Sequence, residues 1–164
     1  MTPFDLVLTN RGVRFMGRYF PCSVGKGGIR SDKREGDGAT PRGLHSITGL
    51  LYRADRMSQP APWAQPIGKD DLWSDASGDA QYNQQVHAPY AHSHEKLRRA
   101  DPLYDLVLLT DWNWPRAEVG KGSAIFLHTW RRRGFPTEGC IAFRRDHMHF
   151  IARNAVPGTR VIVP

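Results

Sequence analysis

Short apolar runs, each bounded by Gly, Pro or Asn, fill both ends of this chain and limit what it can fold into. Apolar runs of about four to eight residues between turn residues are typical of β-strands joined by tight turns. We expect strands at residues 4–9, 13–16, 18–24, 44–53, 105–109, 123–128 and 159–163. Because 164 residues is the size of one domain, the pattern predicts a single, mostly β domain that spans residues 1–164.

One segment near the C-terminus has the period of a helix instead. Residues 145–154 place Met148, Ile151 and Ala152 on one face, and Asp146 near the start is favourable for the helix dipole. The sequence therefore predicts one short C-terminal helix.

Two polar stretches interrupt the strands. Residues 25–43 are rich in Gly and charged side chains, which predicts a surface loop. From about residue 57 to 103 the composition changes to Trp, Pro, Asp, Asn, Gln and His without an apolar period, which predicts a long irregular insertion. Because aromatic side chains such as Trp63, Trp73, Tyr82 and Tyr90 need partners to pack on, we expect this insertion to be ordered and to act as a lid over a cleft.

The chain carries a formal net charge of +7, so its surface favours anionic partners such as nucleic acid, acidic lipid or an acidic polymer. No zinc-finger spacing, aromatic-rich RNA motif or amphipathic basic helix accompanies the arginines, so we do not expect nucleic acid to be the partner. No apolar run is long enough to cross a bilayer, so we also expect no stable membrane insertion.

The two cysteines have different sequence surroundings. Cys22 alternates with Phe20 and Val24, which predicts a small apolar side chain on the inner face of a strand. Cys140 begins an apolar run, and His128 ends an earlier one. A thiol and an imidazole in these positions are a candidate nucleophile and base. We expect the base to lower the pKa of the thiol. The spacing leaves open the alternative that both are ordinary core residues.

The residue before the candidate nucleophile is a glycine. Gly139 permits a substrate to approach the backbone closely, and the N–H groups of Gly139 and Cys140 could stabilise an oxyanion.

The segment around these residues resembles the signature of the L,D-transpeptidase (YkuD-like) catalytic domain family, which has His, a variable loop, Ser or Thr, a polar residue, Gly, Cys and an apolar residue. In this chain the matching residues are His128, Thr137, Glu138, Gly139, Cys140 and Ile141. A second stretch, KREGDGATPRGLHSI, resembles the Thr-Pro-x-Gly turn that precedes a strand in that family. The stretches VGKGG, LWSDASGDAQYNQQV, HSHEKL and YDLVL extend the resemblance over nearly the whole chain, which is most similar to a compact proteobacterial branch.

This resemblance implies a YkuD-like β-sandwich that transfers acyl groups between peptidoglycan stem peptides in the periplasm or cell wall. It implies that Cys140 attacks an L,D-configured amide, that His128 moves the proton, and that Gly139 helps to hold the oxyanion. It further implies no metal and no organic cofactor, and covalent inhibition by carbapenem-type β-lactams.

Candidate substrate-binding residues lie around the Gly-Cys pair and in the insertion: Thr137, Glu138, Arg131, Trp73, Tyr82 and Asn83. Plain alternatives stay open for them, since Arg131–Arg133 could form a solvated turn and the insertion aromatics could simply pack the lid. We expect at most one of the three arginines to point into the cleft. His87, His92 and His94 are spaced too loosely for a zinc site.

The chain departs from the commonest family pattern at two positions. Glu138 stands where His or Arg is usual, and Ala142 where Asn or Arg is usual, so we expect the choice of acceptor to differ. Two other functions stay open: a peptidoglycan L,D-carboxypeptidase or amidase with the same Cys-His pair, and a non-catalytic cell-wall-binding module.

Overall fold

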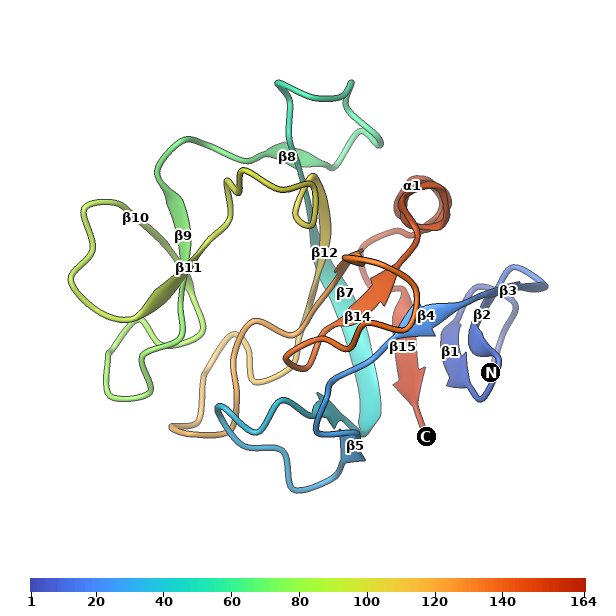
Figure 1. Ribbon diagram of the computed structural model, residues 1–164, viewed down its shortest axis with the longest axis horizontal. Coiled ribbons are helices and arrows are strands. Elements are labelled where there is room, and N and C mark those ends of the chain that lie inside the picture. The colour runs from blue at the N-terminus through green and yellow to red at the C-terminus, as the bar shows by residue number, and fades with distance from the viewer.

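A computed structural model describes all 164 residues of the chain, and most of its regular structure is β (Figure 1). The elements are β1 (Leu6–Thr9), β2 (Gly12–Phe15), β3 (Arg18–Phe20), β4 (Cys22–Ser23), β5 (Ile29–Arg30), β6 (Thr40–Pro41), β7 (Gly43–Tyr52), β8 (Gln65–Pro66), β9 (Asp71–Ser74), β10 (Gln85–His87), β11 (His94–Lys96), β12 (Leu106–Thr110), β13 (Phe126–Thr129), β14 (Ile141–Phe143), α1 (Arg145–Asn154) and β15 (Arg160–Val163).

A ten-stranded main sheet forms the centre of the molecule. Its strand order is β3-β2-β1-β15-β7-β12-β13-β14-β4, and β8 pairs with β7 beside that path. Neighbours are mostly antiparallel, but three pairs run parallel: β1 with β15, β7 with β8, and β13 with β14. Two small sheets, β10-β9-β11 and β5-β6, complete the structure. The prediction of a mostly β, sandwich-like fold with one short C-terminal helix is confirmed.

One face of β12, β13 and β14 packs against α1. Because side chains alternate along a strand, Leu106 and Leu108 of β12 point to this face and join Met148 and Ile151 of the helix in the larger apolar cluster. These side chains are fully buried. The helix spans the predicted residues and buries its predicted face, so the prediction for this segment is confirmed.

The opposite face of the same strands packs against the insertion. Val107 and Phe126 point to this face and form a second apolar cluster with Trp73 and Leu97 of the insertion. Figure 1 shows α1 and the small sheet β10-β9-β11 on opposite sides of β12. The insertion is therefore a packed layer of the fold.

Several boundaries differ from the expectation for physical reasons. The strand expected over residues 18–24 is split into β3 and β4 at Pro21, which has no N–H for the sheet ladder. The strand β13 begins at Phe126, three residues later than expected, because Ala124 adopts a left-handed conformation with φ +52°. The insertion is more regular than its sequence suggests, since it contains β8 to β11.

The structure has one helix, α1, of ten residues. No helix has the length and apolar character needed to cross a membrane.

Candidate active site

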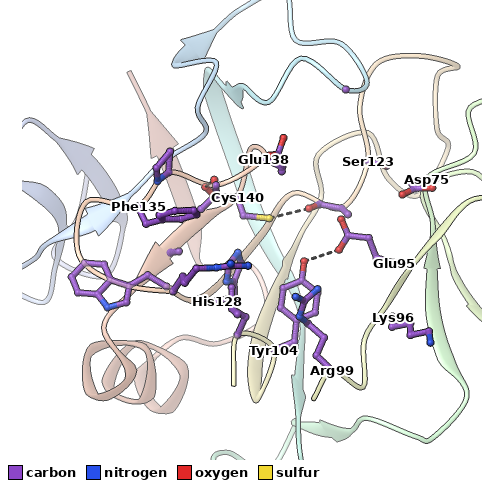
Figure 2. A pocket seen from close by; sticks show the side chains of 18 of the residues that line it. Asp75, Glu95, Lys96, Arg99, Tyr104, Ser123, His128, Phe135, Glu138 and Cys140 are labelled. Carbon is purple, nitrogen blue, oxygen red and sulfur yellow. Dashed lines mark hydrogen bonds between the residues drawn. The ribbon is translucent and has the colours of Figure 1, made fainter. Parts of the chain in front are cut away.

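Cys140 and His128 lie on the face of the sheet that the insertion covers. The parallel strands β13 and β14 pair His128 with Ala142, so the two-residue period of β-strands places Cys140 on the same face as His128. Both side chains line one cavity of about 660 Å³ (Figure 2). The predicted nucleophile and base thus share one site.

Three separate parts of the chain form the wall of this cavity. They are the loop before β6, the insertion and the segment that carries β13 and β14. The insertion contributes Asp75, His94, Glu95, Lys96, Arg99 and Leu103. A segment that lies against the cavity in this way matches the place expected for a lid.

The thiol of Cys140 is held by backbone groups of the neighbouring strand. Sγ donates to the carbonyl of Ala124 at 3.1 Å and accepts from the N–H of Phe126 at 3.4 Å. Only 8% of the residue is exposed, and this burial, aided by the negative charge of Glu95, raises the pKa of the thiol to about 12. In this resting arrangement the groups that lower the pKa of the thiol are the N–H of Phe126 and the charge of Lys33, not His128, and burial outweighs them.

His128 has the protonation pattern of a base. Its Nδ1 lies 2.8 Å from the carbonyl oxygen of Thr129, and a carbonyl can only accept, so Nδ1 carries the proton and Nε2 has a free lone pair. Burial lowers the pKa of the imidazole to about 4, so the ring is neutral at pH 7. The rings of Tyr104 and His128 pack edge to face, with their centroids 5.2 Å apart. No hydrogen bond joins the Cys140 thiol to His128.

The turn before the thiol requires a glycine. Gly139 has φ +136°, and a Cβ there would lie 2.8 Å from the carbonyl oxygen of Ala39. The hydroxyl of Thr40 donates to the carbonyl of Gly139 at 2.8 Å, and the hydroxyl of Thr137 donates to the carbonyl of Cys140 at 2.6 Å. The Thr-Pro-x-Gly stretch therefore lies directly against the Gly-Cys turn.

The expected oxyanion donors need one correction. The N–H of Gly139 is already used, since it donates to Thr137 Oγ1 at 3.1 Å. The N–H groups of Glu138 and Cys140 make no hydrogen bond within the chain. The free donors at this turn are therefore those of Glu138 and Cys140.

Of the residues predicted to contact substrate, Arg131, Thr137 and Glu138 line the cavity. Among the three arginines only Arg131 does so, as expected, and its guanidinium lies 5.2 Å from the centre of the Phe135 ring. Glu138 is exposed and pairs with Lys26 at 2.8 Å.

The three predicted substrate-binding residues of the insertion do not line the cavity, contrary to expectation. Trp73, Tyr82 and Asn83 are each at most 5% exposed. Asn83 Oδ1 accepts from Trp73 Nε1 at 2.9 Å and from the N–H of Ala124 at 3.0 Å, and Tyr82 donates to Glu35. These side chains hold the insertion to the segment whose Ala124 carbonyl contacts the thiol.

Sequence reasoning missed the polar wall opposite the nucleophile. Glu95 accepts a hydrogen bond from Tyr104 at 2.6 Å, and the ring of Tyr104 contacts His128. Lys33 lines the same cavity and pairs with Asp37 at 2.6 Å. These residues come from three distant segments without a shared spacing; the one available signal was their presence in the stretches that resemble the family.

The insertion histidines have other partners. His87 lies 3.0 Å from Asp71, His92 lies 3.8 Å from Asp79, and His94 Nδ1 lies 2.7 Å from the His92 carbonyl. No group of three or more His, Cys, Asp or Glu side chains is placed to hold a metal ion.

Comparison with known proteins gives one match. A model of the L,D-transpeptidase catalytic domain (YkuD) matches residues 6–163. No curated protein and no solved structure matched the chain.

Proposed function

This chain belongs to the L,D-transpeptidase catalytic domain family, and we propose that it cross-links peptidoglycan stem peptides through a thioester on Cys140. The family supports an enzyme of the L,D-transpeptidase type with peptidoglycan as its substrate. The nucleophile, the acceptor and the cross-linking outcome are our proposal.

The geometry supports a general-base mechanism that starts from a neutral pair. The thiol of Cys140 turns from the Ala124 carbonyl toward His128 and gives its proton to Nε2 while sulfur attacks the carbonyl of an L,D-configured amide. The free N–H of Cys140 donates to the developing oxyanion. His128 then protonates the leaving amine, and a thioester remains on Cys140.

A second transfer completes the cycle. The amine of a neighbouring stem peptide attacks the thioester, His128 accepts its proton, and the thiolate leaves and takes that proton back. The new amide is the cross-link.

The observation that carries this proposal is the tautomer of His128. Its Nδ1–H donates to the Thr129 carbonyl, which leaves a basic Nε2 in the same cavity as the only cysteine that lines it. Cys22, the other free cysteine, packs against the apolar core on the α1 side.

Two further parts of the proposal follow from the chemistry. Peptidoglycan lies outside the cytoplasmic membrane, so we place the site of action in the periplasm or cell wall. Carbapenem-type β-lactams contain a strained amide, so we expect them to acylate Cys140.

The test is incubation of the purified protein with disaccharide-peptides, followed by identification of the products by mass spectrometry. Cross-linked dimers from the wild type and from Cys22→Ala, with none from folded Cys140→Ala, are the expected result. Trimmed monomers without dimers would show that the protein is a carboxypeptidase or amidase and not a transpeptidase. Turnover by Cys140→Ala would overturn the assignment of the nucleophile, and no turnover by any variant would favour a binding module.

A further inference from the structure

The peptide group between Gly139 and Cys140 has a hydrogen bond at one end and none at the other. Its carbonyl oxygen accepts from the hydroxyl of Thr40 at 2.8 Å. Its N–H, which belongs to Cys140, makes no hydrogen bond within the chain. A trans peptide is planar, with its C=O and N–H pointing in opposite directions, so a bond that fixes the carbonyl also fixes the N–H. Thr40 therefore sets the direction of the N–H that faces the developing oxyanion in our mechanism.

The hydrogen bonds of Thr40 leave its hydroxyl proton one use. The hydroxyl oxygen accepts from the backbone N–H of Gly25 at 2.9 Å. Because an N–H can only donate, the hydroxyl proton is directed to its other partner, the carbonyl of Gly139. Thr40 is completely buried, so water does not compete for this proton.

The backbone around Thr40 holds the hydroxyl in this place. The N–H of Thr40 donates to the carbonyl of Gly28 at 2.8 Å, and β6 pairs in parallel with β5. Pro41, the next residue, favours an extended conformation of Thr40. A Cβ on Gly25 would collide with the carbonyl oxygen of Gly38, so the close approach that brings the Gly25 N–H to Thr40 requires a glycine.

The free end of this peptide group is the end that a substrate can reach. Thr40 is not among the residues that line the cavity, whereas Cys140 is. The carbonyl end therefore points into the interior, and the N–H end is available to a substrate in the cavity. The neighbouring Gly139 N–H is already bound to Thr137, so the contact with Thr40 acts on a donor that is free.

We propose that Thr40 is the positioning residue of the oxyanion site. Its hydroxyl aims the Cys140 N–H at the oxygen of the attacked carbonyl and, by polarising the shared amide, makes this N–H a stronger donor. The inference rests on the proposed role of Cys140 and adds a residue that does not itself touch the substrate.

The step that depends on Thr40 is the addition of sulfur to the carbonyl carbon. As the C–S bond forms, the π electrons of the C=O bond move to oxygen, and the thiol proton passes to Nε2 of His128. When the C=O bond forms again, the C–N bond breaks, and the leaving nitrogen takes that proton. The negative charge on oxygen exists only between these two events, so Thr40 acts on the rate of acylation and not on the binding of the substrate.

The test separates acylation of Cys140 from its alkylation. Imipenem acylates a thiol through an oxyanion, whereas iodoacetamide alkylates it by displacement at a CH2 group and forms none. Intact mass and peptide mapping follow both reactions in the wild type, Thr40→Val, Thr40→Ser and the control Thr9→Val. Thr9 has the same pattern of bonds outside the cavity, since it accepts from the N–H of Arg11 at 3.2 Å and donates to the carbonyl of Gly12 at 2.7 Å.

The expected loss is confined to acylation. Removal of an oxyanion donor costs about 10²- to 10³-fold in rate, and a misaimed donor costs less, so Thr40→Val should lower the maximal rate of acylation by about 10- to 100-fold. The imipenem concentration that gives half of this maximal rate should stay the same, and so should the rate of alkylation. Thr40→Ser keeps the hydroxyl and should acylate within about threefold of the wild type. Thr9→Val should be unchanged in both reactions.

Three results would overturn the inference. They are equal acylation rates in the wild type and folded Thr40→Val, a parallel loss of acylation and alkylation, and a Thr40→Ser variant as slow as Thr40→Val. If Thr40→Val does not fold, Thr40→Ala takes its place, since it removes the hydroxyl without adding a new contact. These results leave the proposed function standing, because the wild type still forms the acyl-enzyme. No adduct on the wild type would overturn that function and the inference with it.

Discussion

The two faces of β12, β13 and β14 are formed by the same strands but have different roles. Toward α1 the strands present Leu106, Leu127 and Phe143, which are at most 1% exposed and fill a closed apolar core. Toward the insertion they present His128 and Cys140 beside an open cavity. Alternate residues of the same strands therefore contribute to the stability of the core on one face and to the proposed active site on the other. Substitutions on one face should thus affect stability or activity separately.

The difference also appears in the cost of burial. On the α1 face, burial of apolar side chains lowers the free energy of the folded protein. On the insertion face, burial works against the charged form of each group, which raises the pKa of the thiol and lowers that of the imidazole. Ala124 adds a left-handed backbone conformation next to the thiol. The burial of these polar groups and the left-handed Ala124 are less favourable than the apolar packing on the α1 face. Hydrogen bonds from Asn83 of the insertion help to hold Ala124 in place.

The largest expected effect is on activity and comes from the insertion face. His128→Gln removes the base, so turnover should fall by about 10²- to 10⁴-fold while the protein stays folded. The matched control is His87→Gln, which alters an exposed histidine of the insertion and should retain turnover within a factor of two. The measurement is the steady-state rate with disaccharide-peptides. A His128 variant with a near wild-type rate would show that His128 is not the catalytic base.

The next effect is on stability and comes from the α1 face. Phe143→Ala deletes a fully buried ring, which should lower the free energy of unfolding by about 3–5 kcal/mol. Denaturant unfolding measures this, and the rate per folded molecule should stay the same. A loss of activity without a loss of stability would show that the two faces are not separable.

Burial of His128 on the insertion face should also make the stability of the protein depend on pH. The pKa of His128 is about 4 in the folded chain, against 6.5 for a histidine in water, so the unfolded state binds more protons between these values. The contribution of His128 is therefore present above pH 6.5 and is lost as the pH falls toward 4. Between these limits the unfolding free energy of the wild type should drop by about 3 kcal/mol more than that of His128→Gln. Parallel pH profiles for the two proteins would mean that the imidazole is not held neutral by burial.

The smallest of these effects tests how the insertion is attached. Asn83→Ala removes the acceptor for Trp73 and Ala124, which should cost about 2 kcal/mol of unfolding free energy and raise KM through the displaced cavity wall. Gln81→Ala, at an exposed neighbouring position, should change neither value. An Asn83 variant with wild-type stability would mean that the insertion is held by its apolar cluster alone.

The α1 face could be predicted well from the sequence, because its signals are local. The period of residues 145–154 predicts both the helix and its buried side chains, and the structure agrees at each. The break at Pro21 and the late start of β13 were missed, since they depend on a missing N–H and on the left-handed Ala124.

The insertion face could be predicted only in part. The Cys140–His128 pair is marked by local motifs, and the β13–β14 register places both on one face. Glu95 and Tyr104 reach the cavity from segments whose packing depends on the whole fold. Trp73, Tyr82 and Asn83 have the chemistry of a peptide groove, but their hydrogen bonds are used inside the protein.

The proposed function requires that the Cys140 thiol is acylated by a substrate or inhibitor bound in the cavity on the insertion face. The most direct measurement is the mass of the intact protein after exposure to a carbapenem, followed by peptide mapping of wild type, Cys140→Ala and Cys22→Ala. We expect one covalent adduct, on Cys140, in the wild type and in Cys22→Ala, and none in Cys140→Ala. An adduct on Cys22, or no adduct on a folded wild-type protein, would contradict it.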